Sequence, residues 1–334
     1  YCTGLKTVDI SNFNTQAVKN MDSMFGYCTN LTTIYVGENF VTTNARSSDN
    51  MFDNCQLLKG ALPKYNANKT DRRFANYMTG YFSKLVGKNG EEKIGAAGKP
   101  LAAYNLALDD NKDFVAYEPF AAKAASYSRT IKTGNPWATL CLPFEVSLEG
   151  KNFRAFKLLS ADDAKETVEL EEIETSIAAG TPVIIKMNNG ETTLNFIEAD
   201  KEIAHKVVSA ADGGYQLQGL YTQKEFNKDA DNNCYIVKGN KLMNPAKLLA
   251  NTKVTKVVSK PFRAYMVDNS TAPAAGAKMF SIGISDSTTA IDSLNAIADN
   301  KAEYYDLQGK RLNEPQKGIN IVKRNGKTMK VIIK

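Results

Sequence analysis

The chain has 334 residues, of which 43% are hydrophobic and 23% charged, and a formal net charge of +6. This composition is typical of a globular protein with room for two or three domains, and its apolar runs are too short to cross a bilayer as helices. Residues 301–334 hold nine Lys or Arg against three Asp or Glu, so the whole net charge lies in the tail. These basic residues alternate with Ile, Val and Met, a pattern that argues against nucleic acid as a partner.

A cysteine recurs every 26 or 27 residues, because the segment MFGYCTNL at residue 24 returns as MFDNCQLL at residue 51. Such a repeat is compatible with a disulfide framework, a metal site, or a small core residue in a stack of coils. The five cysteines are odd in number, none lies in a C-x-x-C pair, and the chain has a single histidine, so no zinc site is expected. We favour the core residue and expect a ladder of reduced thiols formed by Cys2, Cys28 and Cys55.

The first two repeat units agree at an offset of 26 residues. Each contains the pattern Leu-x-x-Val/Ile-x-Ile/Val, in which alternate apolar side chains of a strand point into a stack. Between the strands, the apolar residues Val18, Met21, Phe25 and Cys28 follow spacings of three, four and three, which predicts a helical stripe. Pro63 stands where a strand residue should donate to a sheet, so we expect the stack to end there.

The segments SNFNTQAVKNMDSMF and KYNANKTDRRFANYMTGYF resemble the BspA-type leucine-rich repeat of bacterial surface proteins. The resemblance covers most of residues 1–83. It implies a leucine-rich-repeat solenoid on a cell-surface protein, and several members of the family are proposed adhesins. It supplies no catalytic residues.

Two further regions follow the repeats. Residues 84–100 are rich in Gly and Lys without a sustained period, and we interpret them as a linker or a long surface hairpin. In residues 101–284, short alternating or apolar runs are separated by Gly, Asn, Asp or Pro, which predicts a mainly β region of one or two sandwich-like or barrel-like modules. The segment YSRTIKTGNPWATLCLPFEV resembles a β domain of secreted and surface proteins of gut Bacteroidetes, for which the resemblance implies no established activity.

Residues 285–334 are expected to form a small C-terminal β module. Asn325 and Gly326 lie between two strand-like runs and are typical of a type I′ hairpin turn. The segment YYDLQGKRLNEPQKGINIV resembles a C-terminal module of exported Bacteroidetes proteins that is related to their sorting domains. The expected fold class is therefore multi-domain α+β, with the end of a leucine-rich-repeat solenoid in residues 1–83, a β-rich domain in residues 101–284 and this module.

Nucleophilic chemistry finds little support in the sequence. Cys141 is flanked by Leu140, Leu142 and Pro143, whereas a reactive thiolate needs an accessible, electropositive environment. We therefore interpret Cys141 as a buried strand residue. His205 is the single histidine, and no G-x-S-x-G or other nucleophile motif accompanies it.

Three groups of acidic residues have both a catalytic or metal-binding and a structural interpretation. One group alternates with apolar residues and fits a solvated strand face, although the carboxylates of a glycosidase are paired in space rather than in sequence. The other two have the oxygen spacing of half a calcium loop but lack its turn glycine and its closing acid, so we favour turn chemistry. The groups are Glu169, Glu171 and Glu172; Asp229, Asp231 and Asn233; and Asp109, Asn111 and Asp113.

Trp137 is the single tryptophan. An exposed tryptophan would offer a platform on which a sugar ring stacks. The apolar residues that follow Trp137 favour burial in the core instead.

The sequence favours a non-enzymatic, exported cell-surface protein that binds a host or extracellular-matrix macromolecule, or a surface glycan, through the open face of the repeat strands. A signal sequence is expected upstream of Tyr1. The alternatives are a carbohydrate-binding accessory protein that acts through the β domain, and a hydrolase whose carboxylates the fold brings together. No cofactor, metal, nucleic-acid partner or transmembrane span is expected. The residues expected on the binding face are Lys6, Thr7, Asp9, Thr32, Thr33 and Tyr35.

Overall fold

The computed structural model divides the chain into two compact units, Tyr1–Ile282 and Gly283–Lys334. Regular structure is almost all β, with 42% strand and 3% helix. Among the described residues, the helices are the 3-10 turn η1 (Arg72–Phe74) and the short α1 (Pro245–Leu249), and none is long and apolar enough to cross a membrane. The expected α+β class is therefore wrong. The structure describes residues 2–208, 214–250, 253–270, 279–283, 303–306, 308–314, 316–324 and 327–333.

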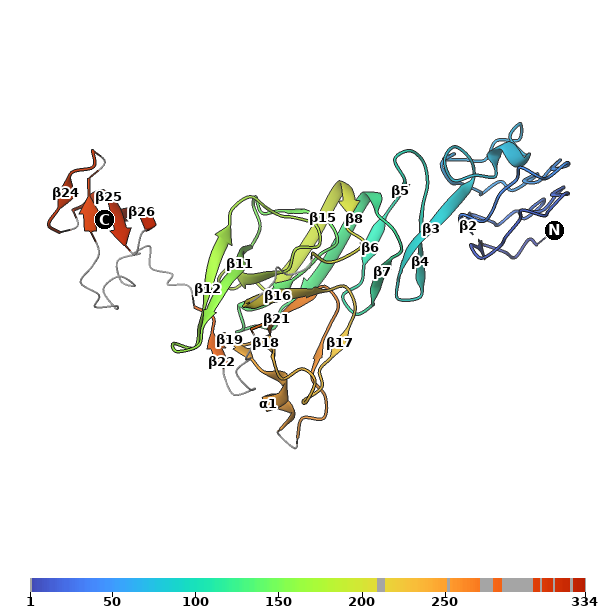
Figure 1. Cartoon of the computed structure of the whole chain (residues 1–334). Coiled ribbons are helices and arrows are strands. Elements are labelled where there is room, and N and C mark those ends of the chain that lie inside the picture. The colour runs from blue at the N-terminus through green and yellow to red at the C-terminus, as the bar shows by residue number, and fades with distance from the viewer. Residues whose placement is uncertain are drawn as a thin grey trace. The chain divides into compact units, whose positions relative to one another are not determined.

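Residues 2–84 form a stack of coils, which we call the N-terminal stack (Figure 1). Its strands β1 (Thr7–Ile10), β2 (Thr33–Val36) and β3 (Phe82–Asn89) pair in parallel. The inward-facing side chains of these strands share one core with the buried Cys28 and Cys55. A stacked pair of Phe25 and Phe52, with centroids 5.6 Å apart, joins successive coils within this core.

The predicted helical stripe is instead a run of turns, so no helical leucine-rich-repeat solenoid is present in the described residues. The backbone N–H groups of Met21, Ser23 and Phe25 donate at 2.9 Å to carbonyls of the next coil, about one repeat further along the chain. A helix would use these donors within its own segment. Ser23 and Tyr27 also have positive φ values of 50° and 59°, which interrupt any helical path.

The stack does not end at Pro63. The chain forms a loop after the third unit and returns as β3, which pairs in parallel with β2. Beyond the end of β2, β3 pairs antiparallel with β4 (Glu92–Ala96) on one side and β7 (Phe114–Ala116) on the other. Residues 84–100 therefore contain a hairpin, the second of the two interpretations of this segment, and β3 runs from the stack into the β region (Figure 1).

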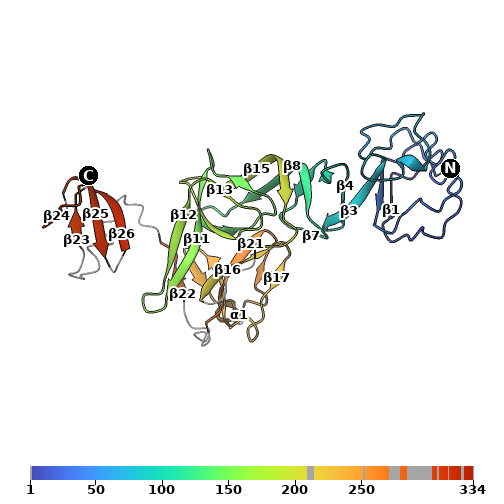
Figure 2. The same ribbon diagram turned by 45° about the horizontal axis from the view of Figure 1, so that its top comes forward.

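The β region contains a nine-stranded sheet in the order β16-β21-β18-β19-β22-β12-β11-β14-β9 and a four-stranded sheet in which β8 pairs with β15, β5 and β6. Figure 2 labels β11, β12, β16, β21 and β22 of the first sheet and β8 and β15 of the second. The nine-stranded sheet is barrel-like and nearly closed, since the Cys141 amide donates to the Phe262 carbonyl at 3.1 Å and so brings the end of β9 beside β21. The buried faces of both sheets share one hydrophobic core. Two short pairs, β10 with β13 and β17 with β20, complete the region. The strands are β5 (Ala102–Ala103), β6 (Leu106–Leu108), β8 (Phe120–Thr130), β9 (Trp137–Leu140), β10 (Val146–Ser147), β11 (Phe153–Asp162), β12 (Thr167–Ile173), β13 (Ser176–Ile177), β14 (Val183–Met187), β15 (Thr193–Ile203), β16 (Tyr215–Leu220), β17 (Lys224–Glu225), β18 (Cys234–Lys238), β19 (Lys241–Met243), β20 (Val258–Ser259), β21 (Arg263–Asp268) and β22 (Met279–Ser281).

The second unit contains β23 (Glu303–Tyr305), β24 (Arg311–Leu312), β25 (Gly318–Arg324) and β26 (Lys327–Ile333). They form one antiparallel sheet in the order β24-β23-β25-β26. Arg324 pairs with Lys327 across β25 and β26. The turn predicted at Asn325 and Gly326 lies outside the described residues.

Candidate functional site

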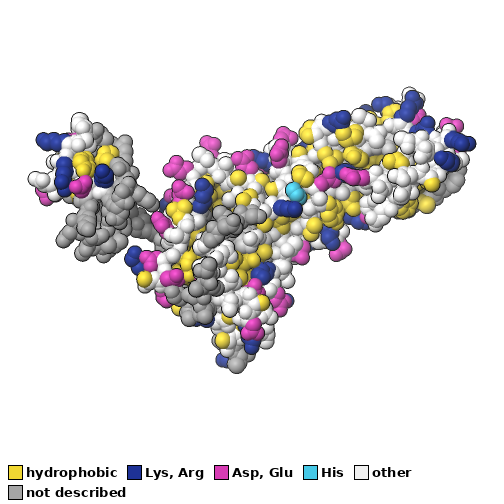
Figure 3. Space-filling view, viewed as in Figure 1, with side chains coloured by type: hydrophobic (Ala, Val, Ile, Leu, Met, Phe, Trp, Pro, Cys, Tyr) yellow, Lys and Arg dark blue, Asp and Glu magenta, His cyan; other side chains and the backbone are white. Residues whose placement is uncertain are grey.

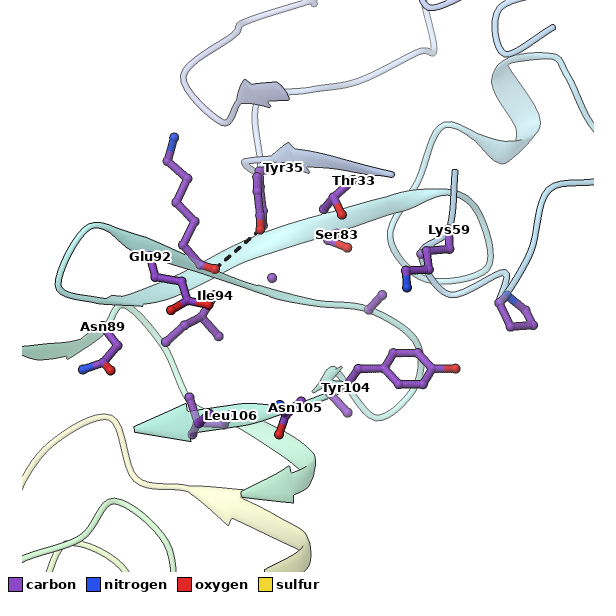
Figure 4. Close-up of a pocket in the computed structure, with 17 residues that line it drawn as sticks. Thr33, Tyr35, Lys59, Ser83, Asn89, Glu92, Ile94, Tyr104, Asn105 and Leu106 are labelled. Atoms are coloured by element: carbon purple, nitrogen blue, oxygen red, sulfur yellow. Dashed lines mark hydrogen bonds between the residues drawn. The ribbon is translucent and has the colours of Figure 1, made fainter. Parts of the chain in front are cut away.

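A cavity of about 600 Å³, which we call the groove, opens between the outer face of β2 and β3, the hairpin strand β4 and the segment that holds β5 and β6 (Figure 4). Its lining combines short polar, charged and apolar side chains. Figure 4 shows Lys59 and the Tyr104 ring on one side of the opening and Glu92 on the other. The lining side chains used below are Thr33, Tyr35, Lys59, Ser83, Asn89, Glu92, Ile94, Tyr104, Asn105 and Leu106.

Strand alternation places the polar residues of β2 on the groove side. Ile34 and Val36 point into the core, so Thr33 and Tyr35 point outward. Ser83 lies beside Tyr35 in the register of β2 and β3. Gly95 of β4 is required here, because a Cβ at this position would lie 2.8 Å from both Tyr35 Cε1 and Ser83 Cβ. The missing side chain allows the Tyr35 ring to lie across the hairpin.

The Tyr35 hydroxyl is held at the edge of the groove. It donates to the backbone carbonyl of Lys93 at 3.5 Å, and burial raises the pKa of the phenol. The Lys93 ammonium lies 2.7 Å from the Asp9 carboxylate. Burial alone would raise the pKa of Asp9, but hydrogen bonds from Lys93 and Ser11 outweigh it and hold that pKa below its usual range. Asp9 is therefore an ionised, paired group rather than a poised base.

Tyr104 is the prominent aromatic residue of the groove. Its side chain is 62% exposed, and the Lys123 ammonium lies 4.4 Å from the ring centroid. The same ring borders a neighbouring hollow of about 420 Å³ that Lys123 and Pro100 also line. Tyr104 thus stands between two hollows and offers an aromatic surface to a ligand that spans both.

The groove has the chemistry of a binding site for polar groups. Thr33 and Ser83 supply hydroxyls, Asn105 an amide, and Lys59 and Glu92 opposite charges. Ile94 and Leu106 are buried and give the groove an apolar part. Asn89 has a structural role. Its Nδ2 donates to the Lys112 carbonyl at 3.1 Å, and its Oδ1 accepts from the Asp109 backbone N–H at 2.9 Å. Glu92 is the single acidic side chain among the described lining residues, so the groove does not contain a carboxylate pair.

Two of the six residues predicted for the binding face, Thr33 and Tyr35, line the groove. Thr7 and Asp9 lie on β1 next to them, in register with Thr33 and Tyr35 respectively. Lys6 precedes β1 and is exposed. The Thr32 hydroxyl donates to the Lys6 carbonyl at 2.9 Å and thereby joins two coils.

The groove residues Lys59, Glu92, Tyr104 and Asn105 were not predicted from the sequence. Lys59 follows the third repeat unit and lies beside Thr32, to whose carbonyl its backbone N–H donates at 3.2 Å. The hairpin and the segment after it bring the other three residues beside β2. One signal was present, since Tyr104 interrupts a series of small and apolar residues in the segment LAAYNLAL.

The residues weighed for nucleophilic or stacking roles lie elsewhere. Cys141 is fully buried, as its neighbours predicted; its thiol donates to the Gly180 carbonyl at 3.4 Å, and burial raises its pKa to about 12. His205 is half-buried just after β15. Trp137 is buried with its ring against Phe156, so the prediction of core burial is confirmed.

The acidic group of β12 forms pairs with side chains of β11. Glu172 accepts from Arg154 at 2.7 Å and Glu169 from the Ser160 hydroxyl at 2.9 Å. The carboxylate of the third residue, Glu171, lies 3.7 Å from an exposed lysine ammonium of β11. These are contacts of a solvated strand face, as predicted.

The two calcium-like loops use their oxygens for turns. The Asp109 carboxylate accepts from the Asn111 amide at 2.9 Å. The Asp231 carboxylate accepts from the Asn227 amide at 2.7 Å and pairs with Lys224 at 2.9 Å. Within the described part of the chain, no group of three or more His, Cys, Asp or Glu side chains is placed to hold a metal ion.

Comparison with known proteins gives a match for the N-terminal stack. Residues 2–86 match the family model described as "Mycoplasma protein of unknown function, DUF285". The match covers about a quarter of the chain and ends inside β3. No curated protein and no solved structure matches the chain. The matched segment contributes Thr33, Tyr35, Lys59 and Ser83 to the groove, whereas Tyr104 lies outside it.

Proposed function

We propose that this chain is a non-enzymatic, exported cell-surface interaction protein that binds a host or extracellular-matrix macromolecule. The binding surface is the outer face of β1 and β2 together with the groove. The observation that carries the proposal is the continuity of the two. Thr7 and Asp9 lie in register with Thr33 and Tyr35, and the latter pair forms one wall of a groove that ends at the exposed Tyr104.

The character of this surface suits recognition of a macromolecule. Short hydroxyl side chains leave the strand face flat, and they donate and accept hydrogen bonds in several directions. Tyrosine is enriched among the residues that contribute most to protein interfaces, because its ring adds apolar contact area at a small entropic cost. Tyr35 and Tyr104 place one such ring on each side of the groove.

Export is supported by two resemblances. The repeat segments resemble BspA-type surface proteins, and the same segment matches the DUF285 family model. The final module resembles C-terminal modules of exported proteins.

Figure 3 shows acidic and basic side chains interspersed on the visible face of the first unit.

The proposal is tested by measuring the binding of the full chain to a panel of purified extracellular-matrix proteins and to a glycan array. Thr33→Arg places a long charged side chain in the groove, so it should weaken binding to any partner by about tenfold. Ser128→Arg is the matched control, because Ser128 is exposed on β8 and does not line the groove. Equal loss in both variants, or no binding to any panel member, would refute the proposal.

A carbohydrate-binding role is the second candidate, and the exposure of Tyr104 between two hollows favours it. A sugar ring would stack on the Tyr104 ring, and its hydroxyls would bond to groove residues. On the glycan array, this function predicts a hit that Tyr104→Ala abolishes while binding to matrix proteins is absent. Binding to a matrix protein without any glycan hit would favour the first candidate.

A further inference from the structure

A separate cavity of about 340 Å³ lies where β9 meets β21, and all of its lining residues lie outside the matched segment. Its floor and rim carry four basic side chains and one acidic side chain. Lys132 and Lys260 are exposed at the rim, whereas Arg129 and Arg263 lie deeper. The charged lining residues are Asp110, Arg129, Lys132, Lys260 and Arg263.

The single carboxylate of this cavity is already used. Asp110 accepts two hydrogen bonds from the Arg263 guanidinium, at 2.7 and 3.0 Å, and a third from the Tyr127 hydroxyl. The Arg263 side chain is only 11% exposed, so this is a partly buried, bidentate pair. The cavity thus holds two guanidinium groups and one carboxylate, and Arg263 makes the bidentate pair with that carboxylate. The second guanidinium is near the same charge but makes no bidentate pair with it.

Arg129 is that second guanidinium. Its Nη1 donates to the Thr139 carbonyl at 2.8 Å, but its Nε is buried without a hydrogen-bond partner. Buried polar atoms are nearly always bonded, so an exception of this kind calls for a ligand or another explanation. Burial and the nearby charge of Arg263 lower the pKa of Arg129 to about 10, so the group remains a cation at neutral pH.

We propose that this cavity binds an oxyanion group, the carboxylate or phosphate of a small ligand. A guanidinium presents parallel N–H donors that match two oxygens of such a group. Arg129 lines the cavity, but its unbonded Nε is buried, so the side chain would turn toward the cavity to present this donor to the ligand. Lys132 and Lys260 add positive charge at the entrance, and the Lys260 ammonium is oriented by the Asn111 side chain at 2.7 Å. This site is independent of the groove and of the function proposed for it.

The test is titration calorimetry on the full chain with inorganic phosphate, glucuronate and glucose. Phosphate or glucuronate should bind, whereas glucose, which matches glucuronate in shape but lacks the carboxylate, should not. Selective binding of phosphate or of glucuronate identifies the source of the oxyanion. Affinity should fall about tenfold in Arg129→Gln, as expected for loss of a charge-assisted hydrogen bond, and it should weaken as salt is added.

Two further variants keep the test decisive if Arg129→Gln disturbs folding. Lys260→Gln alters an exposed side chain and should weaken binding about threefold, because it removes one rim charge. Lys157→Gln, an exposed lysine of β11 outside the cavity, should leave binding unchanged. The ¹⁵Nε resonance of Arg129 should shift with each bound oxyanion. The absence of oxyanion binding up to about 10 mM, a concentration that detects millimolar sites, would overturn the proposal. So would Arg129→Gln and Lys260→Gln variants that bind the oxyanion as tightly as the parent protein.

Discussion

Cys55 lies beneath Phe25 with its thiol donating to the Phe25 carbonyl at 3.0 Å, while Cys2 is exposed. Of the three cysteines expected in the thiol ladder, Cys28 and Cys55 are therefore buried and Cys2 is not. Burial raises the pKa of Cys55 to about 11 and those of Cys141 and Cys234 to about 12. Since the thiolate is the reactive form, burial protects these residues both by blocking access and by suppressing ionisation.

The thiols should accordingly differ in reactivity with an aromatic disulfide reagent at neutral pH. In the folded protein, Cys2 should react quickly, and the four buried cysteines should react only as fast as the chain opens. In urea without reductant, all five thiols should titrate. Three or fewer titratable thiols in urea would show that disulfides replace the ladder.

Asp110 should link stability to acid pH. Burial alone would raise its pKa, but hydrogen bonds from Arg263 and Tyr127 outweigh it and hold the pKa below the usual range of an aspartate. A depressed carboxyl pKa stabilises the fold at pH above the unfolded value, and this contribution is lost as pH falls through the folded value. Asp110→Asn should cost about 3 kcal/mol in urea unfolding at about pH 7, because it leaves Arg263 unpaired, and it should flatten the loss of stability below about pH 4.

Asp109→Asn is the control for this prediction. Its side chain is 41% exposed and pairs with an exposed Lys112, and an asparagine oxygen can still accept from the Asn111 amide. The change should cost about 0.5 kcal/mol or less. If the two variants lose equal stability, the Asp110 pair does not contribute as described.

Sequence predicted burial well at residues whose neighbours are apolar, such as Cys141 and Trp137. It could not predict the role of Arg129, because the donor left unbonded there depends on Thr139 and Arg263, which lie 10 and 134 residues further along the chain. Tyr104 was missed for the same reason. The exposure and the partners of a polar side chain are set by tertiary contacts, which local pattern does not contain.

At the level of elements, alternation identified β1 and β2 correctly, since a period of two is specific to strands. The spacing of three and four between them was misleading. Such spacing fixes which side chains face the core but does not determine where the backbone N–H groups donate. In this stack they donate to the next coil, and residues with positive φ recur at equivalent places, at Ser23 and Asn50 and at Tyr27 and Asn54.

Asn50 provides a test of these turns. Its φ is 56°, a conformation that asparagine and glycine adopt more readily than alanine. Asn50→Ala should therefore destabilise the fold by about 1 kcal/mol in urea unfolding, whereas Asn50→Gly should lie within about 0.5 kcal/mol of the parent. An alanine variant as stable as the glycine variant would contradict the left-handed turn.

At the level of the whole molecule, β3 is the element that sequence could least predict. It pairs with β2, β4 and β7, and so runs from the matched N-terminal segment into the β region. Its first residues lie before the expected boundary at residue 83 and the rest lie after it. Pairings between segments so far apart in the chain leave no trace in local periodicity.

Truncated chains test this continuity and the predicted domain boundaries. A fragment of residues 1–83 retains only the first two residues of β3 and loses β4 and β7, so it should not unfold cooperatively. A fragment of residues 1–282 corresponds to the first compact unit and should unfold cooperatively. Circular dichroism during urea unfolding distinguishes the two. A cooperative transition of the short fragment would show that the stack folds without its β3 pairings.

The central claim is that the groove is where this protein binds its partner, and Tyr104 tests it most directly. Tyr117 is the matched control, because it is also exposed, at 53%, but does not line the groove. Binding of the full chain to the panel member it binds most tightly should be measured by surface plasmon resonance. We predict that Tyr104→Ala weakens binding by at least about tenfold, as for an interface anchor, and that Tyr117→Ala changes it by less than about twofold. Equal affinities of the two variants would contradict the account.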